Sequence, residues 1–186
     1  MLETEIYALN EPETLPYCPF DFSGLSLLQK MFLLTDGTLT KIIEAYVAER
    51  LQVLKLAEGM AVLVHDMPPL QISIGQEVIE RKILLQGIVS RRNWLYAESL
   101  IIPDRLDPHF KDRLLHSREP IGKLWIEHKT ETFREVLASF REPAGAVATY
   151  FTISPAEHLL CRSYRVFSNR KPVMLITEKF PESYFV

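Results

Sequence analysis

Two charged residues in otherwise apolar, strand-like segments are the side chains of this sequence best suited to chemistry. Side chains alternate along a strand, so Arg81 shares a face with Ile83, and Glu178 shares a face with Ile176. A charge buried in a sheet is costly unless it meets an opposite charge or a charged ligand. The pattern therefore leaves two interpretations open, a structural salt bridge, which is the commoner arrangement, or a small polar site.

The two residue types define what such a site would do. Arg81 offers a planar fork that binds a carboxylate through two parallel hydrogen bonds, which a lysine does not reproduce. Glu178, buried among apolar neighbours, could handle a proton. If the two residues share a site, these roles would suit an acidic small molecule and a proton transfer, but the pattern alone favours the structural salt bridge.

Other charged candidates are weaker. Glu98 and Ser99 lie in the strand expected to pair with that of Arg81, although the polarity of a sheet surface also explains them. Arg162 and Arg165 fall on opposite faces of one strand, so at most one of them faces a shared pocket.

Several common kinds of site have no signature in the sequence. The five histidines, at 65, 109, 116, 128 and 158, show no metal-ligand spacing. Glycine-rich phosphate loops and nucleophile elbows are also missing. We therefore expect chemistry that uses no metal, no organic cofactor and no covalent nucleophile.

Length and composition indicate an ordinary globular protein. The 186 residues suit one domain, with 47% hydrophobic and 24% charged residues. The net charge of −3 gives no support for nucleic-acid binding. No apolar run is long enough to span a membrane, and the acidic start does not resemble a signal peptide. Cys18 and Cys161 are expected to be reduced, buried thiols, and the protein to be cytoplasmic.

The expected elements alternate between helices and hairpins. Residues 1–22 contain three prolines and are expected to form an extended lead-in. Ser23 is expected to cap a helix that reaches residue 34, and Thr38 or Thr40 a second helix through Val47. Residues 105–127 are expected to be helical, and a short helix is expected at 155–160.

The remaining patterns indicate strands. They lie at 52–56, with a possible extension at 61–64, and at 76–86, 94–102, 130–138, 162–167 and 172–180. The pattern of 130–138 also fits a helix, and the flanking β pattern favours the strand. Short links between 76–86 and 94–102, and between 162–167 and 172–180, predict two antiparallel hairpins. The fold class is therefore α+β, with helices over an antiparallel sheet.

Six short segments, taken in order, carry a resemblance to a known family. They are Asp36-Gly37-Thr38-Leu39-Thr40, Arg81-Lys82-Ile83-Leu84-Leu85, Tyr96-Ala97-Glu98-Ser99, Pro120-Ile121-Gly122, Tyr164-Arg165-Val166 and residues 172–180. Their order and spacing resemble the chorismate pyruvate-lyase family, in particular its mycobacterial and cyanobacterial branch. The resemblance covers residues 25–183 and implies an antiparallel sheet with helical flaps on one side, enclosing the site.

The resemblance also implies an activity and residue roles. The family converts chorismate to 4-hydroxybenzoate and pyruvate, for use in pathways such as quinone biosynthesis. Its ligand arginine falls on Arg81, its essential glutamate on Glu178, and its two ligand-binding backbone amides on Leu39 and Ile121. Glu98 is expected to line the pocket, where it departs from the enterobacterial branch. On this basis the ligand, rather than a salt bridge, separates Arg81 from Glu178.

A second function is compatible with the same fold. It resembles the effector-binding domains of GntR-like transcription repressors, which bind small molecules without converting them. No basic winged-helix segment precedes the expected domain in this sequence, which favours the enzyme. The alternative is a non-catalytic domain that binds aromatic acids.

Overall fold

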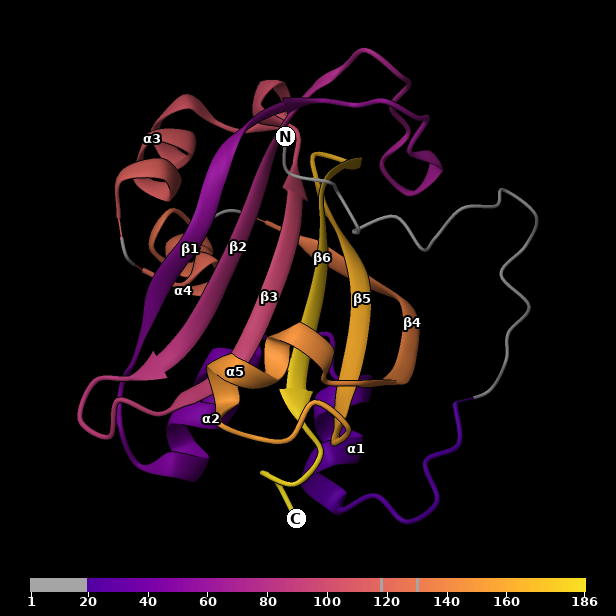
Figure 1. Cartoon of the computed structure of the whole chain (residues 1–186). Coiled ribbons are helices and arrows are strands. Elements are labelled where there is room, and N and C mark those ends of the chain that lie inside the picture. The colour runs from indigo at the N-terminus through magenta and orange to yellow at the C-terminus, as the bar shows by residue number, and fades with distance from the viewer. Residues whose placement is uncertain (1–19, 118, 130) are drawn as a thin grey trace.

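An antiparallel sheet of six strands organises the molecule (Figure 1). The computed structural model describes residues 20–117, 119–129 and 131–186. The strands are β1 (Leu51–Val62), β2 (Glu77–Gly87), β3 (Asn93–Ile101), β4 (Phe133–Pro143), β5 (His158–Ser168) and β6 (Lys171–Pro181). Their order in the sheet is β1-β2-β3-β6-β5-β4, so two three-stranded meanders join where β3 pairs with β6.

Four helices cover one face of the sheet. They are α1 (Leu27–Leu34), α2 (Leu39–Val47), α3 (Pro108–His116) and α4 (Ile121–Glu127). Figure 1 shows α1 and α2 near one end of the sheet, α3 and α4 further along it, and the short α5 (Ala148–Phe151) on the opposite face. Three single-turn 3-10 helices, at Pro68–Leu70, Pro103–Arg105 and Gly145–Val147, complete the elements of the described chain. We call the face under α1 to α4 the covered face.

Apolar side chains of the covered face attach both helix pairs. Phe32 and Leu33 of α1 pack in one buried cluster with Leu95 of β3. Phe110 of α3 and Trp125 of α4 belong to a second cluster over the other end of the sheet. The two clusters leave a space between them, and the functional residues lie there.

The α+β class and the antiparallel sheet expected from the sequence are confirmed, but several boundaries differ. Helix α1 begins one turn later than expected, because Ser26 and Gln29 form a capping box while Ser23 binds Asp21. Of the expected lead-in at 1–22, residues 1–19 lie outside the described residues, as does Cys18. Cys161 is a buried free thiol.

The helix expected at 155–160 is wrong. The side chain of Glu157 accepts the amide of Ser154 at 2.8 Å, and this closes a turn directly before β5. Helix α5 forms upstream instead.

Strand β1 is continuous rather than two pieces, and it contains a bulge. Its register with β2 shifts between Lys55 and Ala57, where one extra residue, Leu56, is accommodated. A bulge reverses the alternation of side chains beyond it. Lys55 and Glu58, which a regular strand would place on opposite faces, therefore both lie on the covered face, opposite Ile83 and Arg81.

Candidate functional site

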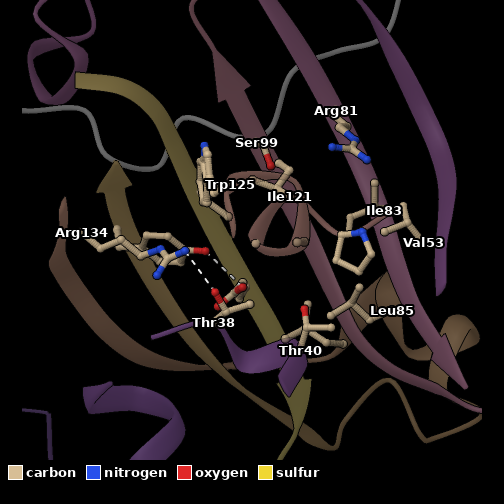
Figure 2. Close-up of a pocket in the computed structure, with 17 residues that line it drawn as sticks. Thr38, Thr40, Val53, Arg81, Ile83, Leu85, Ser99, Ile121, Trp125 and Arg134 are labelled. Atoms are coloured by element: carbon tan, nitrogen blue, oxygen red, sulfur yellow. Dashed lines mark hydrogen bonds between the residues drawn. The ribbon is translucent and has the colours of Figure 1, made fainter. Parts of the chain in front are cut away.

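A cavity lies between the sheet and the N-terminal ends of α2 and α4 (Figure 2). The space within it that no atom fills is about 530 Å³, and part of this volume is open to solvent. The residues that line it are Thr38, Thr40, Val53, Arg81, Ile83, Leu85, Leu95, Ala97, Ser99, Pro120, Ile121, Gly122, Trp125, Arg134, Tyr164, Ile176 and Glu178. Both residues singled out from the sequence, Arg81 and Glu178, therefore face the same cavity.

The strand register explains how the floor of the cavity is built. Arg81 on β2 is level with Ser99 on β3, and Glu178 on β6 is level with Ala97 on β3. Because β2 and β6 are two strands apart, the Cα atoms of Arg81 and Glu178 should be about 12 Å apart by ordinary strand spacing. Ser99 and Ala97, which lie between them, have small side chains. A charged group therefore stands at each side of a shallow floor with room for a ligand.

Arg81 is a buried cation without hydrogen bonds. Its side chain is 1% exposed, and none of its three guanidinium nitrogens has a hydrogen-bond partner among the described residues. Burial lowers the pKa of Arg81, and the carboxylate of Glu58, with Oε2 3.2 Å from Nε, partly offsets that effect. Buried polar groups are nearly always satisfied in proteins, so these free donors indicate a site for an acceptor such as a carboxylate.

Glu178 is held by two donors on β5. Arg162 Nε donates to Oε2 at 2.7 Å, and the Tyr164 hydroxyl donates to Oε1 at 3.2 Å. Burial, followed by the charge of Glu178, raises the pKa of Tyr164, so its phenol stays protonated and donates. A carboxylate that accepts hydrogen bonds at both oxygens is fixed in position.

Arg162 joins Glu178 to the end of α1. Its Nη1 donates to the carbonyls of Phe32 and Thr35, at 2.9 and 2.6 Å, and its Nη2 to that of Gly37 at 3.2 Å. Burial opposes the charge of Arg162, but its interaction with Glu178 outweighs this, and the pKa of Arg162 is raised. Arg81 and Glu178 therefore do not form a salt bridge with each other. Arg81 pairs with Glu58, and Glu178 pairs with Arg162.

The two residues expected to offer backbone amides begin the helices that cover the cavity. Leu39 is the first residue of α2 and Ile121 the first residue of α4. Amides in the first turn of a helix have no carbonyl within that helix to bind. The side chain of Leu39 is fully buried in the core, whereas its neighbours Thr38 and Thr40 line the cavity.

The starts of α2 and α4, which we call the two covers, touch each other at Thr38 and Gly122. A Cβ atom on Gly122 would lie 2.4 Å from Cγ2 of Thr38, so only glycine fits at this point of α4. Arg134 of β4 binds the start of α2 at the same contact. It donates to the carbonyl of Asp36 at 2.8 Å and to Thr38 Oγ1 at 3.1 Å. Its guanidinium also lies over the ring of Trp125, 5.1 Å from the centroid. In Figure 2, Arg134 and Arg81 stand on opposite sides of the cavity.

Glu98 does not line the cavity. It is level with Lys82 on the other face of the sheet, where it accepts from the Tyr96 hydroxyl at 2.6 Å and lies 3.6 Å from Lys82 Nζ. Ser99, its neighbour, faces the cavity instead. The expectation for Glu98 is corrected because strand alternation allows only one of the two residues to face Arg81.

Four further charged residues near the site were not selected from the sequence. Arg134 comes from a strand whose pattern is ambiguous, and Lys55 and Glu58 share a face only because of the bulge in β1. Arg162 was considered, but its partner could not be assigned from one strand alone. A pairing register for β5 and β6, which places Arg162 opposite Glu178, is the signal that would have found it.

Within residues 20–117, 119–129 and 131–186, no group of three or more His, Cys, Asp or Glu side chains is placed to hold a metal ion. No helix in these ranges has the length and apolar character needed to cross a membrane.

Comparison with known proteins gives a consistent result at the level of sequence. The family model described as chorismate pyruvate-lyase Rv2949c-like matches residues 33–185. A protein of Mycobacterium tuberculosis (strain CDC 1551 / Oshkosh) named chorismate pyruvate-lyase is 28% identical over 165 residues, covering 84% of this chain and 80% of that protein. A protein of the same name from Mycobacterium leprae (strain TN) is 27% identical over 158 residues, covering 84% and 75%.

Solved structures with the same fold carry other titles. The effector domain of PhnF from Mycobacterium smegmatis superposes with a TM-score of 0.63 at 10% identity, covering 82% of this chain and 93% of that one. The C-terminal domain of the histidine utilization repressor from Pseudomonas syringae pv. tomato str. DC3000 gives a TM-score of 0.53 at 16% identity, covering 72% and 93%. At these identities the likeness concerns the fold alone.

Proposed function

Because the chain belongs to the chorismate pyruvate-lyase Rv2949c-like family, we propose that it eliminates pyruvate from chorismate and forms 4-hydroxybenzoate. One structural observation supports this most strongly. The guanidinium of Arg81 is buried at the wall of the cavity and has no hydrogen bond to the described residues, while Glu178 lines the same cavity. A small acid with a hydroxyl at the end opposite its carboxylate matches both groups.

The carboxylate end of the ligand is assigned to Arg81 and the two covers. Arg81 supplies two parallel donors, and the first amides of α2 and α4, on Leu39 and Ile121, supply two more. Amides at a helix start also carry part of the positive end of the helix dipole. These donors bring the covers towards the sheet when the ligand is bound.

The other end of the ring is assigned to Glu178. Arg162 and Tyr164 already donate to its two oxygens, so it is fixed as an acceptor for the ring hydroxyl. Holding the ring at both ends aligns the C–O bond that breaks with the C–H bond at the adjacent ring carbon. The apolar side chains of Ile83, Leu85 and Ile176 exclude water from between these ends.

The reaction balances without an added reagent. The C–O bond between the ring and the enolpyruvyl group breaks, and its electron pair leaves with the enolpyruvyl oxygen. The C–H bond at the neighbouring carbon supplies the electrons of the new ring double bond, and its proton ends on the methylene carbon of the leaving group. Aromatisation drives the step, so the protein mainly positions the reactant.

The deciding experiment mixes the purified protein with chorismate and measures 4-hydroxybenzoate and pyruvate. We expect both to form in equal amounts. The variant Arg81→Lys should raise KM by at least about tenfold, because a point charge does not replace the bidentate fork. Arg141→Lys, in an ion pair with Glu182 at 2.7 Å outside the cavity, is the matched control and should behave like the unchanged protein.

The same mixture tests the alternative function. Binding of chorismate or 4-hydroxybenzoate without any pyruvate would support a non-catalytic domain that senses aromatic acids, and would contradict the lyase.

A further inference from the structure

A group of three charged side chains stands behind the cavity wall. Glu58 Oε2 lies 3.2 Å from Arg81 Nε, and Glu58 Oε1 accepts from Lys55 Nζ at 2.9 Å. Arg81 lines the cavity, whereas Lys55 and Glu58 do not. The carboxylate of Glu58 is therefore shared between two cations, only one of which meets a ligand.

The contact between Glu58 and Arg81 is incomplete. Neither Glu58 Oε2 nor any guanidinium nitrogen of Arg81 takes part in a hydrogen bond among the described residues, although the two atoms are close. Lys55 also donates to the carbonyls of Leu114 and Leu115 near the end of α3, at 3.3 and 2.5 Å. These bonds hold Lys55 in place at Glu58 Oε1, while Glu58 Oε2 lies beside Arg81.

This arrangement has consequences for charge. A buried arginine with no anion nearby is strongly disfavoured, so the empty site needs Glu58. An anionic ligand that reaches Arg81 must then compete with Glu58 for the same cation, and is also repelled by it. Lys55 acts in the opposite direction, since it withdraws part of the charge of Glu58 from Arg81.

We propose that Glu58 is a resident counter-ion of Arg81 that weakens the binding of carboxylate ligands, and that Lys55 sets how strongly it competes. This inference rests on the proposed function, because it gives the Arg81 site a means to release its aromatic acid product. Both residues are positioning residues, brought to one face by the bulge in β1.

The test measures the affinity of benzoate and of uncharged benzamide by titration calorimetry. Glu58→Gln removes the competing charge and should bind benzoate about tenfold more tightly, as expected for removing a like charge a few ångströms away. Lys55→Gln frees Glu58 and should weaken benzoate binding severalfold. Benzamide affinity should change less than about twofold in both variants, because it carries no charge.

A matched control uses the same strand. Glu80 is adjacent to Arg81 on β2, and its side chain points to the other face of the sheet. Glu80→Gln should leave both affinities within about twofold, since only a charge beside Arg81 on the covered face competes directly.

The outcomes separate this inference from the proposed function. Unchanged or weaker benzoate binding by Glu58→Gln would overturn the inference, even if the unchanged protein converts chorismate. If Glu58→Gln does not fold, the benzoate affinity of Lys55→Gln decides the inference. Equal losses of affinity for benzoate and benzamide in that variant would show that Lys55 has a purely structural role and would overturn the inference. If the affinities change as expected but chorismate is not converted, the lyase proposal is wrong and the counter-ion inference stands. No benzoate binding by any form would overturn the inference, while conversion of chorismate would still decide the lyase proposal.

Discussion

At the scale of single residues, the site depends on ionised groups that are each held by a partner of opposite charge. Glu178 is paired with Arg162, and Arg81 lies beside Glu58. Each pair has one member that lines the cavity and one that stands behind it. The supporting residues therefore belong to the proposed site as much as the two residues that line the cavity.

Glu178→Gln should reduce kcat for chorismate at least about 100-fold, because the amide cannot replace an ionised acceptor at the ring hydroxyl. The substitution also removes the partner charge of buried Arg162, so the free energy of unfolding should fall by about 1–3 kcal/mol. Steady-state kinetics and urea unfolding measure the two effects.

The control for this substitution is Glu142→Gln. Glu142 accepts from Lys179 at 2.8 Å outside the cavity, so its loss should leave kcat unchanged. A Glu178→Gln protein that is folded and fully active would contradict the role given to Glu178.

Residue alternation alone located much of the cavity floor. It grouped Arg81 with Ile83 and Leu85, and all three line the cavity. It could not choose between Glu98 and Ser99, because that choice depends on the register between β2 and β3 rather than on one strand. It missed Glu58, because the bulge that changes its face leaves no clear mark in the sequence.

At the scale of elements, the cavity is closed by two helix starts that meet. The sequence predicted both helical regions from local signals, although α1 is capped by Ser26 rather than by Ser23. The contact between Gly122 and Thr38 joins residues 84 positions apart, so no local pattern predicts it. It is nevertheless the point where closure can be tested most directly.

Gly122→Ala should force the starts of α2 and α4 apart, because its new methyl group would lie 2.4 Å from Thr38 Cγ2. We expect KM to rise about tenfold, with a loss of about 1–3 kcal/mol in the free energy of unfolding, as is usual for overpacking. Kinetics and thermal unfolding provide the measurement.

A double variant identifies the cause. Thr38→Ser removes the methyl group that is nearest to the added one, so the pair should be less impaired than the sum of the single changes. Gly59→Ala on β1, where a Cβ atom meets nothing within 4 Å, is the control. Strictly additive effects would show that the covers do not meet through these residues.

At the scale of the whole molecule, one side chain connects the outer strand of the sheet to both covers. Strand β4 lies at the opposite end of the strand order from β1, and Arg134 extends from it to the turn before α2 and to Trp125 of α4. Apart from this side chain and the contact between Thr38 and Gly122, the two helix pairs pack on separate apolar clusters. Arg134 is thus placed to couple the movement of one cover to that of the other.

Arg134→Met keeps an apolar stem over Trp125 but removes the donors to Asp36 and Thr38. We expect faster amide hydrogen exchange at residues 35–40 and 121–127, and faster dissociation of 4-hydroxybenzoate, because both covers lose a shared anchor. The core clusters remain, so the free energy of unfolding should fall by only about 1–2 kcal/mol. Exchange followed by mass spectrometry and stopped-flow dissociation measure these changes.

Arg165→Met is the matched comparison, because Arg165 also combines hydrogen bonds with an aromatic contact, but on the other face of the sheet. It donates to Glu135 at 2.7 Å and lies 5.0 Å from the ring centroid of Phe167. Its loss should leave exchange in both covers and ligand dissociation unchanged.

If Arg134→Met speeds exchange in only one cover, each helix pair moves independently and the connection through Arg134 is wrong. Faster exchange in both, with slower or unchanged dissociation, would place the release step elsewhere in the molecule.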